Sequence, residues 1–289
     1  MGANIKTIRA RIRSVESTMH ITKAMELVAS SKVKRAVARM EESRFYRTVI
    51  LDAFAELSEA GTIYSKPRSE SLPVLYIVIA GDRGLAGGYN GNIFRSTAVT
   101  LRENDAVLPI GKRAVDHFER RQVNVVSSEF VSVETMKSEE CSRAAYLIRD
   151  MYDRGEIGGV RLIYTRFVSM LTQTPDMICL LPLEKEDMES INGAAEKSTA
   201  GSQAARAVVE YEPSAESVLN ALIPEYIAGV LYSAVCEAFA SEVASRRSAM
   251  DTATKNADEM LDTLSLKYNR ARQSAITQEI TEIVAGAGE

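Results

Sequence analysis

Residues 21–36 read ITKAMELVASSKVKRA and form the stretch from which the fold can be worked out. Ala, Met, Glu, Leu and Lys favour a helix, and neither Gly nor Pro interrupts them. Four basic residues, Lys23, Lys32, Lys34 and Arg35, lie among the apolar ones. Such a helix is too apolar for a simple solvated face and too basic for a simple core. The fold must therefore supply the surfaces that this helix faces.

Glycine and proline interrupt helices, so the stretches that lack both are informative. Residues 3–60 contain neither, and residues 230–285 contain neither. The segment 61–212 between them holds 12 of the 16 glycines. This distribution predicts two long terminal helices with a mixed segment inserted between them.

Apolar residues of the N-terminal helix recur at alternating steps of three and four, which is the spacing of a coiled-coil seam. The first members of this seam are Ile5, Ile8, Ile12, Val15 and Met19. The same steps then reach two polar residues, Thr22 and Glu26, inside the opening stretch. After them the seam resumes with Ala29, Val33, Ala36 and Met40. Asn4 is expected to cap the start of this helix.

The C-terminal helix carries a matching seam through Leu261, Leu264, Tyr268, Ala271 and Ala275. Ser214 or the preceding Pro213 is expected to start this helix, and Pro224 and Gly229 are expected to kink its first turns. At 1.5 Å per residue the two helices would be about 80 Å and about 100 Å long, too long for the inside of a globular domain. Because their seams match, we expect the two helices to pair with each other.

The inserted segment alternates between strand-like and helix-like patterns. Strands are expected at 73–80, 107–110, 123–126, 159–168 and 176–183, and helices at 91–103, after 110 through 121, and at 136–154. Such alternation predicts an α/β domain with a largely parallel sheet. Residues 184–210 are polar and small without periodicity, and we expect a loop or a mobile segment there.

Charge is unevenly distributed, although the net charge of the chain is only −4. Residues 1–47 hold eleven Lys and Arg against four acids, a local net charge of +7, whereas residues 250–289 have a local net charge of −3. The basic arm allows three explanations: a solvated helix face, an acidic protein partner, or nucleic acid. Nucleic acid would be contacted by Arg9, Arg11, Arg13, Lys32, Lys34, Arg35 and Arg39.

The segment GDRGLAGGYN at 81–90 lies after a strand and before a helix, where phosphate-binding loops lie. It lacks both the Gly-Lys-Ser/Thr of a P-loop and the G-x-G-x-x-G pattern. A nucleotide-binding enzyme using this loop is one hypothesis. A tight connection in which Asp82 and Arg83 pair or cap is the simpler alternative.

Residues for catalysis or metal binding are sparse. Neither His20 nor His117 has a second residue at the spacing of a metal or catalytic site. The acidic residues lie on helix faces, and no pair of them differs from an ordinary solvent-exposed surface. Cys141, Cys179 and Cys236 match neither a metal spacing nor a disulfide framework, which indicates a reducing compartment. The sequence also has neither an apolar run of membrane-spanning length nor a secretory signal. We therefore expect no catalytic, cofactor or metal site.

Three segments together resemble one protein family: ITKAMELVASSKVKRA, DRGLAGGYN at 82–90 and YNRARQSAITQEITEIVAGAG at 268–288. They resemble, in this order and along the full length, the gamma subunit of the rotary F-type ATP synthase of bacteria. The resemblance implies an antiparallel coiled coil of long N- and C-terminal helices with an inserted Rossmann-like α/β domain. The coiled-coil shaft would comprise 1–60 and 212–289, and the inserted domain 70–211, with 184–210 mobile.

The resemblance also implies a function and partners. Members of the family are the central rotor stalk, which couples ion-driven rotation of the membrane c ring to conformational change in the alpha/beta hexamer. They have no catalytic site of their own. The implied partners are the alpha, beta and epsilon subunits and the c-subunit ring, with no cofactor and no nucleic acid. The implied location is peripheral, on the cytoplasmic face of the bacterial plasma membrane.

Several partner contacts follow from matching motifs of the family. The resemblance implies hexamer contacts at Lys23, Met25, Lys32, Arg35, Arg246, Arg272, Gln273 and Thr277. It implies contacts near the c ring and epsilon at Tyr211 and Glu212. Ile276, Ile280 and Ile283 share one face at steps of four and three. They would lie in an apolar collar of the hexamer, or alternatively pack on the N-terminal helix.

Overall fold

The computed structural model describes residues 2–57, 63–65, 68–69, 71–183, 212 and 214–286. By their contacts they divide into two compact units, Met1–Ser31 with Arg246–Glu289, and Lys32–Ser245. The two terminal helices predicted from the lack of glycine and proline are both present: α1 spans Gly2–Leu57 and α6 spans Ala215–Gly286.

The starts of both helices can be compared with the expected caps. The Ser217 backbone N–H donates to the Ser214 hydroxyl at 3.2 Å, so Ser214 caps α6 as predicted. The predicted cap of α1 is wrong, because the helix begins at Gly2 and Asn4 lies inside it. Pro224 lies within α6, which is assigned as one continuous helix.

One described helix segment, Ser217–Gly286, is long and apolar enough in one window to cross a membrane by length and composition. Of that window, 67% is buried inside the protein, as expected for the core helix of a folded domain. This finding is weak support for a membrane span.

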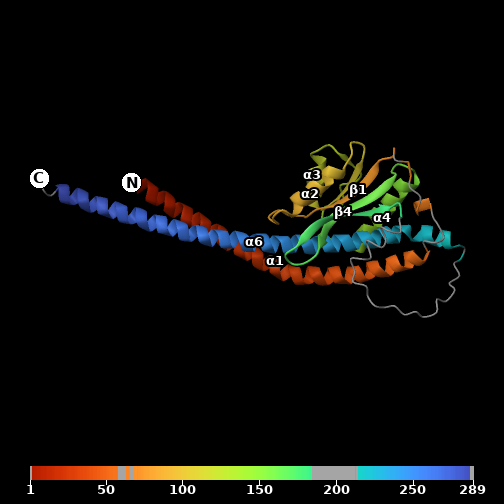
Figure 1. The fold of residues 1–289 in the computed structure, drawn as a ribbon, viewed down its shortest axis with the longest axis horizontal. Coiled ribbons are helices and arrows are strands. Elements are labelled where there is room, and N and C mark those ends of the chain that lie inside the picture. Colours follow the sequence, from red (N-terminus) through yellow and green to blue (C-terminus); the bar gives the residue numbers. More distant parts are fainter. Residues whose placement is uncertain are drawn as a thin grey trace. The chain divides into compact units, whose positions relative to one another are not determined.

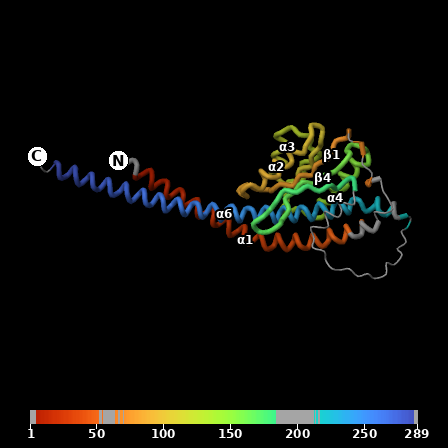
Figure 2. Tube along the Cα trace, in the orientation of Figure 1, coloured from red at the N-terminus to blue at the C-terminus, as the bar shows by residue number. Residues whose placement is uncertain are grey.

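In the first unit, the ends of α1 and α6 pair in antiparallel directions (Figure 2). Arg9 contacts Tyr268, with its guanidinium carbon 5.5 Å from the ring centre, and Thr22 contacts Thr254, with their hydroxyl oxygens 2.8 Å apart. Along both helices, the predicted seam residues are less exposed than most of their neighbours. The polar break at Thr22 is therefore a hydrogen-bonded layer of the seam, and the two threonines satisfy each other.

The second unit is built on a five-stranded sheet in the order β3-β2-β1-β4-β5 (Figure 1). Its strands are β1 Val74–Ile79, β2 Ala106–Ile110, β3 Asn124–Val125, β4 Gly159–Phe167 and β5 Gln173–Leu181. All neighbouring strands are parallel except β4 and β5, which are antiparallel, so the prediction of a largely parallel sheet is confirmed. The connecting helices are η2 Ile63–Ser65, α2 Tyr89–Thr100, α3 Lys112–Glu119 and α4 Ser138–Asp153. The expected loop 184–210 lies outside the described residues.

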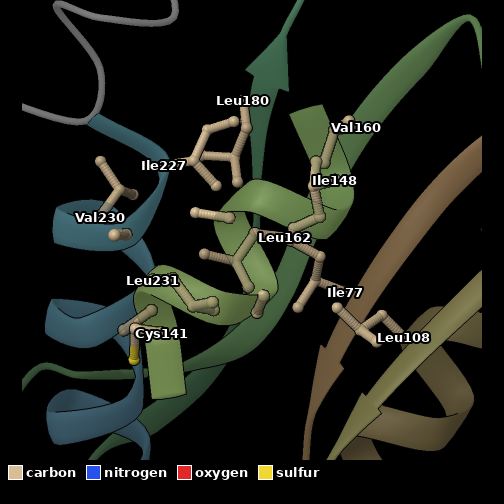
Figure 3. Close-up of a cluster of buried hydrophobic side chains, with 14 of the residues drawn as sticks. Ile77, Leu108, Cys141, Ile148, Val160, Leu162, Leu180, Ile227, Val230 and Leu231 are labelled. Carbon is tan, nitrogen blue, oxygen red and sulfur yellow. The ribbon is translucent and has the colours of Figure 1, made fainter. Parts of the chain in front are cut away.

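Each face of the sheet has its own apolar core. Side chains from α2 and α3, such as Ile93 and Phe118, cover one face. On the other face, side chains of the strands meet α4 and α6, and the ring centres of Phe54 on α1 and Tyr226 on α6 are 5.0 Å apart. Figure 3 shows Leu162 and Leu180 of the sheet beside Ile148 of α4 and the apolar residues of α6.

In this unit α1 packs on the side of α6 that faces away from the sheet (Figure 1). Small residues allow the close approach: a Cβ added at Gly229 would lie 2.7 Å from the Ile50 Cδ1 atom. Ala36 and Met40 of α1 join Cys236 and Ala240 of α6 in a separate apolar cluster. The position of Gly229 thus serves helix packing.

A buried carboxylate connects α1, α6 and the sheet. Glu237 on α6 is 1% exposed, and its oxygens lie 2.7 Å from Arg44 Nη2 and 3.8 Å from Arg47 Nη1, both on α1. The backbone N–H of Phe167, at the end of β4, donates to the same carboxylate at 3.0 Å. These partners compensate the cost of burying the charge.

Replacing Glu237 by Ala should lower the free energy of unfolding by about 3–5 kcal/mol, because the buried Arg47 and the partly exposed Arg44 would lose their counter-charge. Urea unfolding followed by circular dichroism measures this change. Asp251→Ala, which removes an exposed i,i+4 pair with Lys255, is the matched control and should change stability far less. Equal effects of the two substitutions would contradict this account.

Candidate functional site

The C-terminal end of α6 presents an uncovered apolar stripe. Ile276, Ile280, Ile283 and Val284 are 47%, 56%, 70% and 66% exposed. All described residues from 276 to 286 are exposed, so these side chains do not pack on α1. Of the two alternatives left open by the sequence, packing on the N-terminal helix is therefore wrong. A contiguous exposed apolar stripe of this kind is typical of an interaction surface.

The polar residues before and within this stripe are also available to a partner. Arg272, Gln273 and Thr277 are exposed. The Thr277 hydroxyl donates to the backbone carbonyl of Gln273 at 3.0 Å, a bond within the helix. The side chains of this end of α6 therefore combine an apolar face with polar and basic neighbours.

The opening stretch 21–36 has its own exposed apolar residues. Ile21, Leu27 and Val28 are 58%, 62% and 57% exposed, and Lys23 is exposed near them on α1. Met25 is half-buried. Sequence reasoning did not single out Ile21, Leu27 and Val28. The sequence could have indicated them, because they are large apolar residues outside the seam positions.

Lys32 differs from the other basic residues of the stretch because it has an internal partner. Its Nζ donates to Glu134 Oε1 at 2.5 Å, and both side chains are about one-third exposed. Nearby on α1, Arg39 donates to the Glu134 and Met136 backbone carbonyls at 3.1 and 2.5 Å. In contrast, Lys23 and Arg35 are exposed. Lys32 and Arg39 thus hold the segment 134–136, which weakens the nucleic-acid hypothesis for both.

The same segment is held from its other side by Asp82, in the glycine-rich loop after β1. The Asp82 carboxylate accepts hydrogen bonds from the backbone N–H groups of Val133 at 2.9 Å and Glu134 at 3.1 Å, and from the Ser132 hydroxyl at 3.0 Å. Asp82 therefore caps the chain at 132–134, and the proposed capping role is confirmed with this partner. Lys32, Glu134 and Asp82 form a continuous clamp between α1 and the loop after β1.

Other side chains of the protein lie against the glycine-rich loop and bond to its backbone. Asn90 accepts from the Gly81 N–H at 2.8 Å and donates to the Arg83 carbonyl at 3.2 Å. A Cβ added at Gly81 would lie 2.6 Å from the carboxyl carbon of Glu242, which is buried on α6. A buried carboxylate at this position is unfavourable for a phosphate group.

The carboxyl ends of β1 and β4, where a sheet of this order has its ligand crevice, are covered by α6. The Tyr89 hydroxyl donates to the Ala238 carbonyl at 2.9 Å. The Ser241 hydroxyl donates to the Thr165 carbonyl at 3.1 Å, and the Ser245 hydroxyl to the Ala86 carbonyl at 2.9 Å. A helix thus occupies the position that a dinucleotide takes in an enzyme of this architecture. The structure therefore does not support the hypothesis of a nucleotide-binding enzyme using 81–90.

Two further expected contact residues lie elsewhere. Arg246 on α6 is half-buried, and Glu212 is exposed just before α6 begins. Tyr211 lies outside the described residues. The expected contact residues that the structure describes thus lie on α1, on α6 and just before α6.

The shifted pKa values of the described Cys141 and His117 follow from burial. Burial raises the pKa of the Cys141 thiol to about 12, which makes it unreactive at neutral pH. Burial also lowers the pKa of His117, which stacks on Phe94. Among the residues that the structure describes, no group of three or more His, Cys, Asp or Glu could hold a metal ion.

Comparison with known proteins explains this architecture. A family model described as ATP synthase matches residues 4–288. The ATP synthase gamma chain of Ruminococcus albus is 42% identical and covers 97% of this chain and 96% of its own length. The chain belongs to the family of ATP synthase gamma chains. Another gamma chain, described as sodium ion specific, from Acetobacterium woodii, is 37% identical over 99% of both chains.

Solved structures share the fold of this gamma chain. A chain of the Euglena gracilis mitochondrial ATP synthase, in a structure containing F1 and the c-ring, gives a TM-score of 0.68 at 17% identity, covering 99% of this chain and 94% of that one. A chain of the rotor of the same organism's enzyme gives 0.64 at 19% identity, covering 96% and 100%. These similarities confirm the expected fold, with long terminal helices around an inserted α/β domain.

Replacing Asp82 by Ala should increase the amide hydrogen-exchange rates of Val133 and Glu134 by about tenfold or more, because both N–H groups lose a charged acceptor worth about 1.5–3 kcal/mol. Exchange followed by NMR or mass spectrometry measures this effect. Glu103→Ala, an exposed acid in the turn before β2, is the matched control. Unchanged exchange at 133–134 in the Asp82 variant would show that the loop is held by other contacts.

Proposed function

We propose that this gamma chain is the central rotor stalk of a bacterial F-type ATP synthase. In this role it couples rotation of an ion-driven c ring to conformational change in the alpha/beta hexamer. The observation that carries the proposal is the match to gamma chains over nearly the whole length. The uncovered apolar end of α6 supports it, because a free helix end needs a partner surface.

The proposed division of labour follows the types of structure in the chain. Residues 1–60 and 212–289 would form the shaft, and 70–211 the inserted domain at the foot of the stalk. A shaft that transmits torque must resist twisting and bending. Two helices interlocked along a seam of alternating steps supply such stiffness, since each layer holds the next.

The proposed hexamer contacts are mostly polar or basic, with an apolar face at the end of the shaft. Lys23 and Arg35 are exposed and suit an acidic loop of beta that must be contacted and released in turn. Arg246, Arg272, Gln273, Thr277 and Met25 complete this proposed set. Ile276, Ile280 and Ile283 would turn within an apolar collar. Hydrophobic contacts have no preferred direction, so they oppose rotation less than hydrogen bonds would.

We also propose that the chain has no catalytic site of its own. The crevice of its sheet is covered by α6 through Tyr89, Ser241 and Ser245. Catalysis would then belong to the hexamer, and this chain would change which hexamer site is open.

The foot of the stalk is proposed to bind the epsilon subunit and the c ring near Tyr211 and Glu212. The chain would thereby be attached to the cytoplasmic face of the plasma membrane without entering it. No nucleic acid is part of this proposal, because Arg9, Lys32 and Arg39 already have internal partners.

A truncated chain lacking residues 1–30 and 260–289 tests the shaft role. Assembled with alpha, beta, epsilon and the membrane ring in vesicles, it should lose ion-gradient-driven ATP synthesis, because the hexamer would no longer follow the rotor. The full chain assembled in parallel is the control, and luciferase measures the ATP formed. Synthesis at the rate of the full chain would refute the proposed role.

Charge reversal separates contacts with the hexamer from contacts within the chain. Lys23→Glu and Arg35→Glu should reduce the number of ions pumped per ATP hydrolysed, because like charges would then face the acidic loop of beta. Lys32→Glu should reduce it too, but by opening the clamp to Glu134.

The double variant Lys32→Glu/Glu134→Lys should therefore restore pumping, since it rebuilds the ion pair in reverse. Pumping is measured with a pH-sensitive dye and hydrolysis with a coupled assay. If the double variant pumps no better than Lys32→Glu alone, then Lys32 acts on the hexamer and not through Glu134.

A further inference from the structure

A cavity of about 870 Å³ lies at the amino ends of β1 and β4, beyond the last turn of α2. Val74, the first residue of β1, and Gly159, the first residue of β4, both line it, as does Thr100 at the end of α2. Its volume falls within the range of about 300–1,000 Å³ that is usual for small-molecule sites. The proposed rotor function makes no use of this cavity.

Among the residues that the structure describes, three arginines and no acidic residue line the cavity. Arg68 comes from the segment before β1, Arg102 from the turn after α2, and Arg161 from β4. Three positive charges in one concave space repel one another, and a concave wall of low dielectric concentrates their field. A bound anion would remove this repulsion.

The described side-chain contacts of Arg161 and Arg68 are with tyrosines. Arg161 Nη1 donates to the Tyr76 hydroxyl at 3.4 Å, and the Arg68 guanidinium carbon lies 4.1 Å from the centre of the Tyr152 ring. These partners are neutral. Among the described residues, no carboxylate pairs with any of the three, whereas Arg166 on the same strand as Arg161 pairs with Asp176 at 2.7 Å.

A buried acid at this end of the sheet, Asp105, accepts hydrogen bonds from the backbone. Asp105 is buried, and its two carboxylate oxygens accept from the backbone N–H groups of Val74 and Arg102, each at 2.9 Å. It holds the turn after α2 against the start of β1 and is not among the residues that line the cavity. Asp105 therefore shapes the cavity from behind the residues that line it, and its single charge offsets only part of the positive charge of the three arginines.

We propose that this cavity binds a phosphate-bearing small molecule or head group. Guanidinium groups hold phosphate oxygens through paired, charge-assisted hydrogen bonds, which suits Arg161 and its neighbours. The Tyr76 hydroxyl is already oriented, because it donates to the Thr100 carbonyl at 3.3 Å and accepts from Arg161. The remaining wall includes Leu72 and Val99, which would contact the organic part of the ligand.

Calorimetric titration of the full chain with glycerol 3-phosphate at about 20 mM salt tests the proposal, because at that ionic strength screening is weak. Flotation with phosphatidylglycerol vesicles, against phosphatidylcholine vesicles, tests the head-group source. The variants are Arg161→Gln and the exposed Arg102→Gln, each checked by its melting temperature. Arg120→Gln, an exposed arginine at the end of α3, is the matched control with the same loss of charge.

We expect saturable binding of at least one probe, weakened about tenfold or more in Arg161→Gln and Arg102→Gln and unchanged within about twofold in Arg120→Gln. Binding of glycerol 3-phosphate would identify a soluble ligand, and binding of anionic vesicles alone would identify a lipid head group. The proposal is overturned if neither probe binds, or if Arg120→Gln weakens binding as much as the cavity variants do. Both results would leave the rotor function untouched, because the full chain could still support ATP synthesis.

Discussion

The burial of α6 between the sheet and α1 is the constraint on which the second unit depends. Val230, Leu231, Ala234 and Val235 are almost fully buried, and most of the helix from 226 to 244 has no solvated side. A helix buried all round must be apolar or must satisfy each polar group internally. Glu237 does so through Arg44, Arg47 and the Phe167 N–H, and Ser241 does so through the Thr165 carbonyl. Those bonds fix where α1 and the sheet meet α6.

The same burial explains why an α/β sheet of nucleotide-binding order serves here without a nucleotide. At the carboxyl ends of its central strands, the Thr165 carbonyl accepts a hydrogen bond from the Ser241 hydroxyl of α6, and the buried Glu242 carboxylate lies beside Gly81. The loop 81–90 keeps the tight turn of a phosphate-binding loop, including Gly87 at a φ of 57°, but caps the segment 132–134. At the position of a ligand crevice, α6 packs on the sheet. The fold alone would therefore have predicted the wrong function.

Several features could be predicted from the sequence because they depend on local rules. The lack of glycine and proline gave both long helices, and the steps of three and four gave the residues that pair in the first unit. The alternation of strand and helix patterns gave all five strands within a few residues. The exposure of Ile276, Ile280 and Ile283 could not be decided, because the same spacing fits a paired helix and an unpaired one.

By itself, the sequence determined the element order, the seam and, through its motifs, the family. Only the tertiary structure decided the partners of the charged groups, because ion pairs join residues far apart in the chain. In the sequence, Lys32 is one of four basic residues in the stretch 21–36. In the structure it pairs with Glu134, about a hundred positions away. Thr22 read as a fault in the seam, yet it bonds to Thr254. Periodicity reports which side of a helix is covered, and only three-dimensional contact reports what covers it.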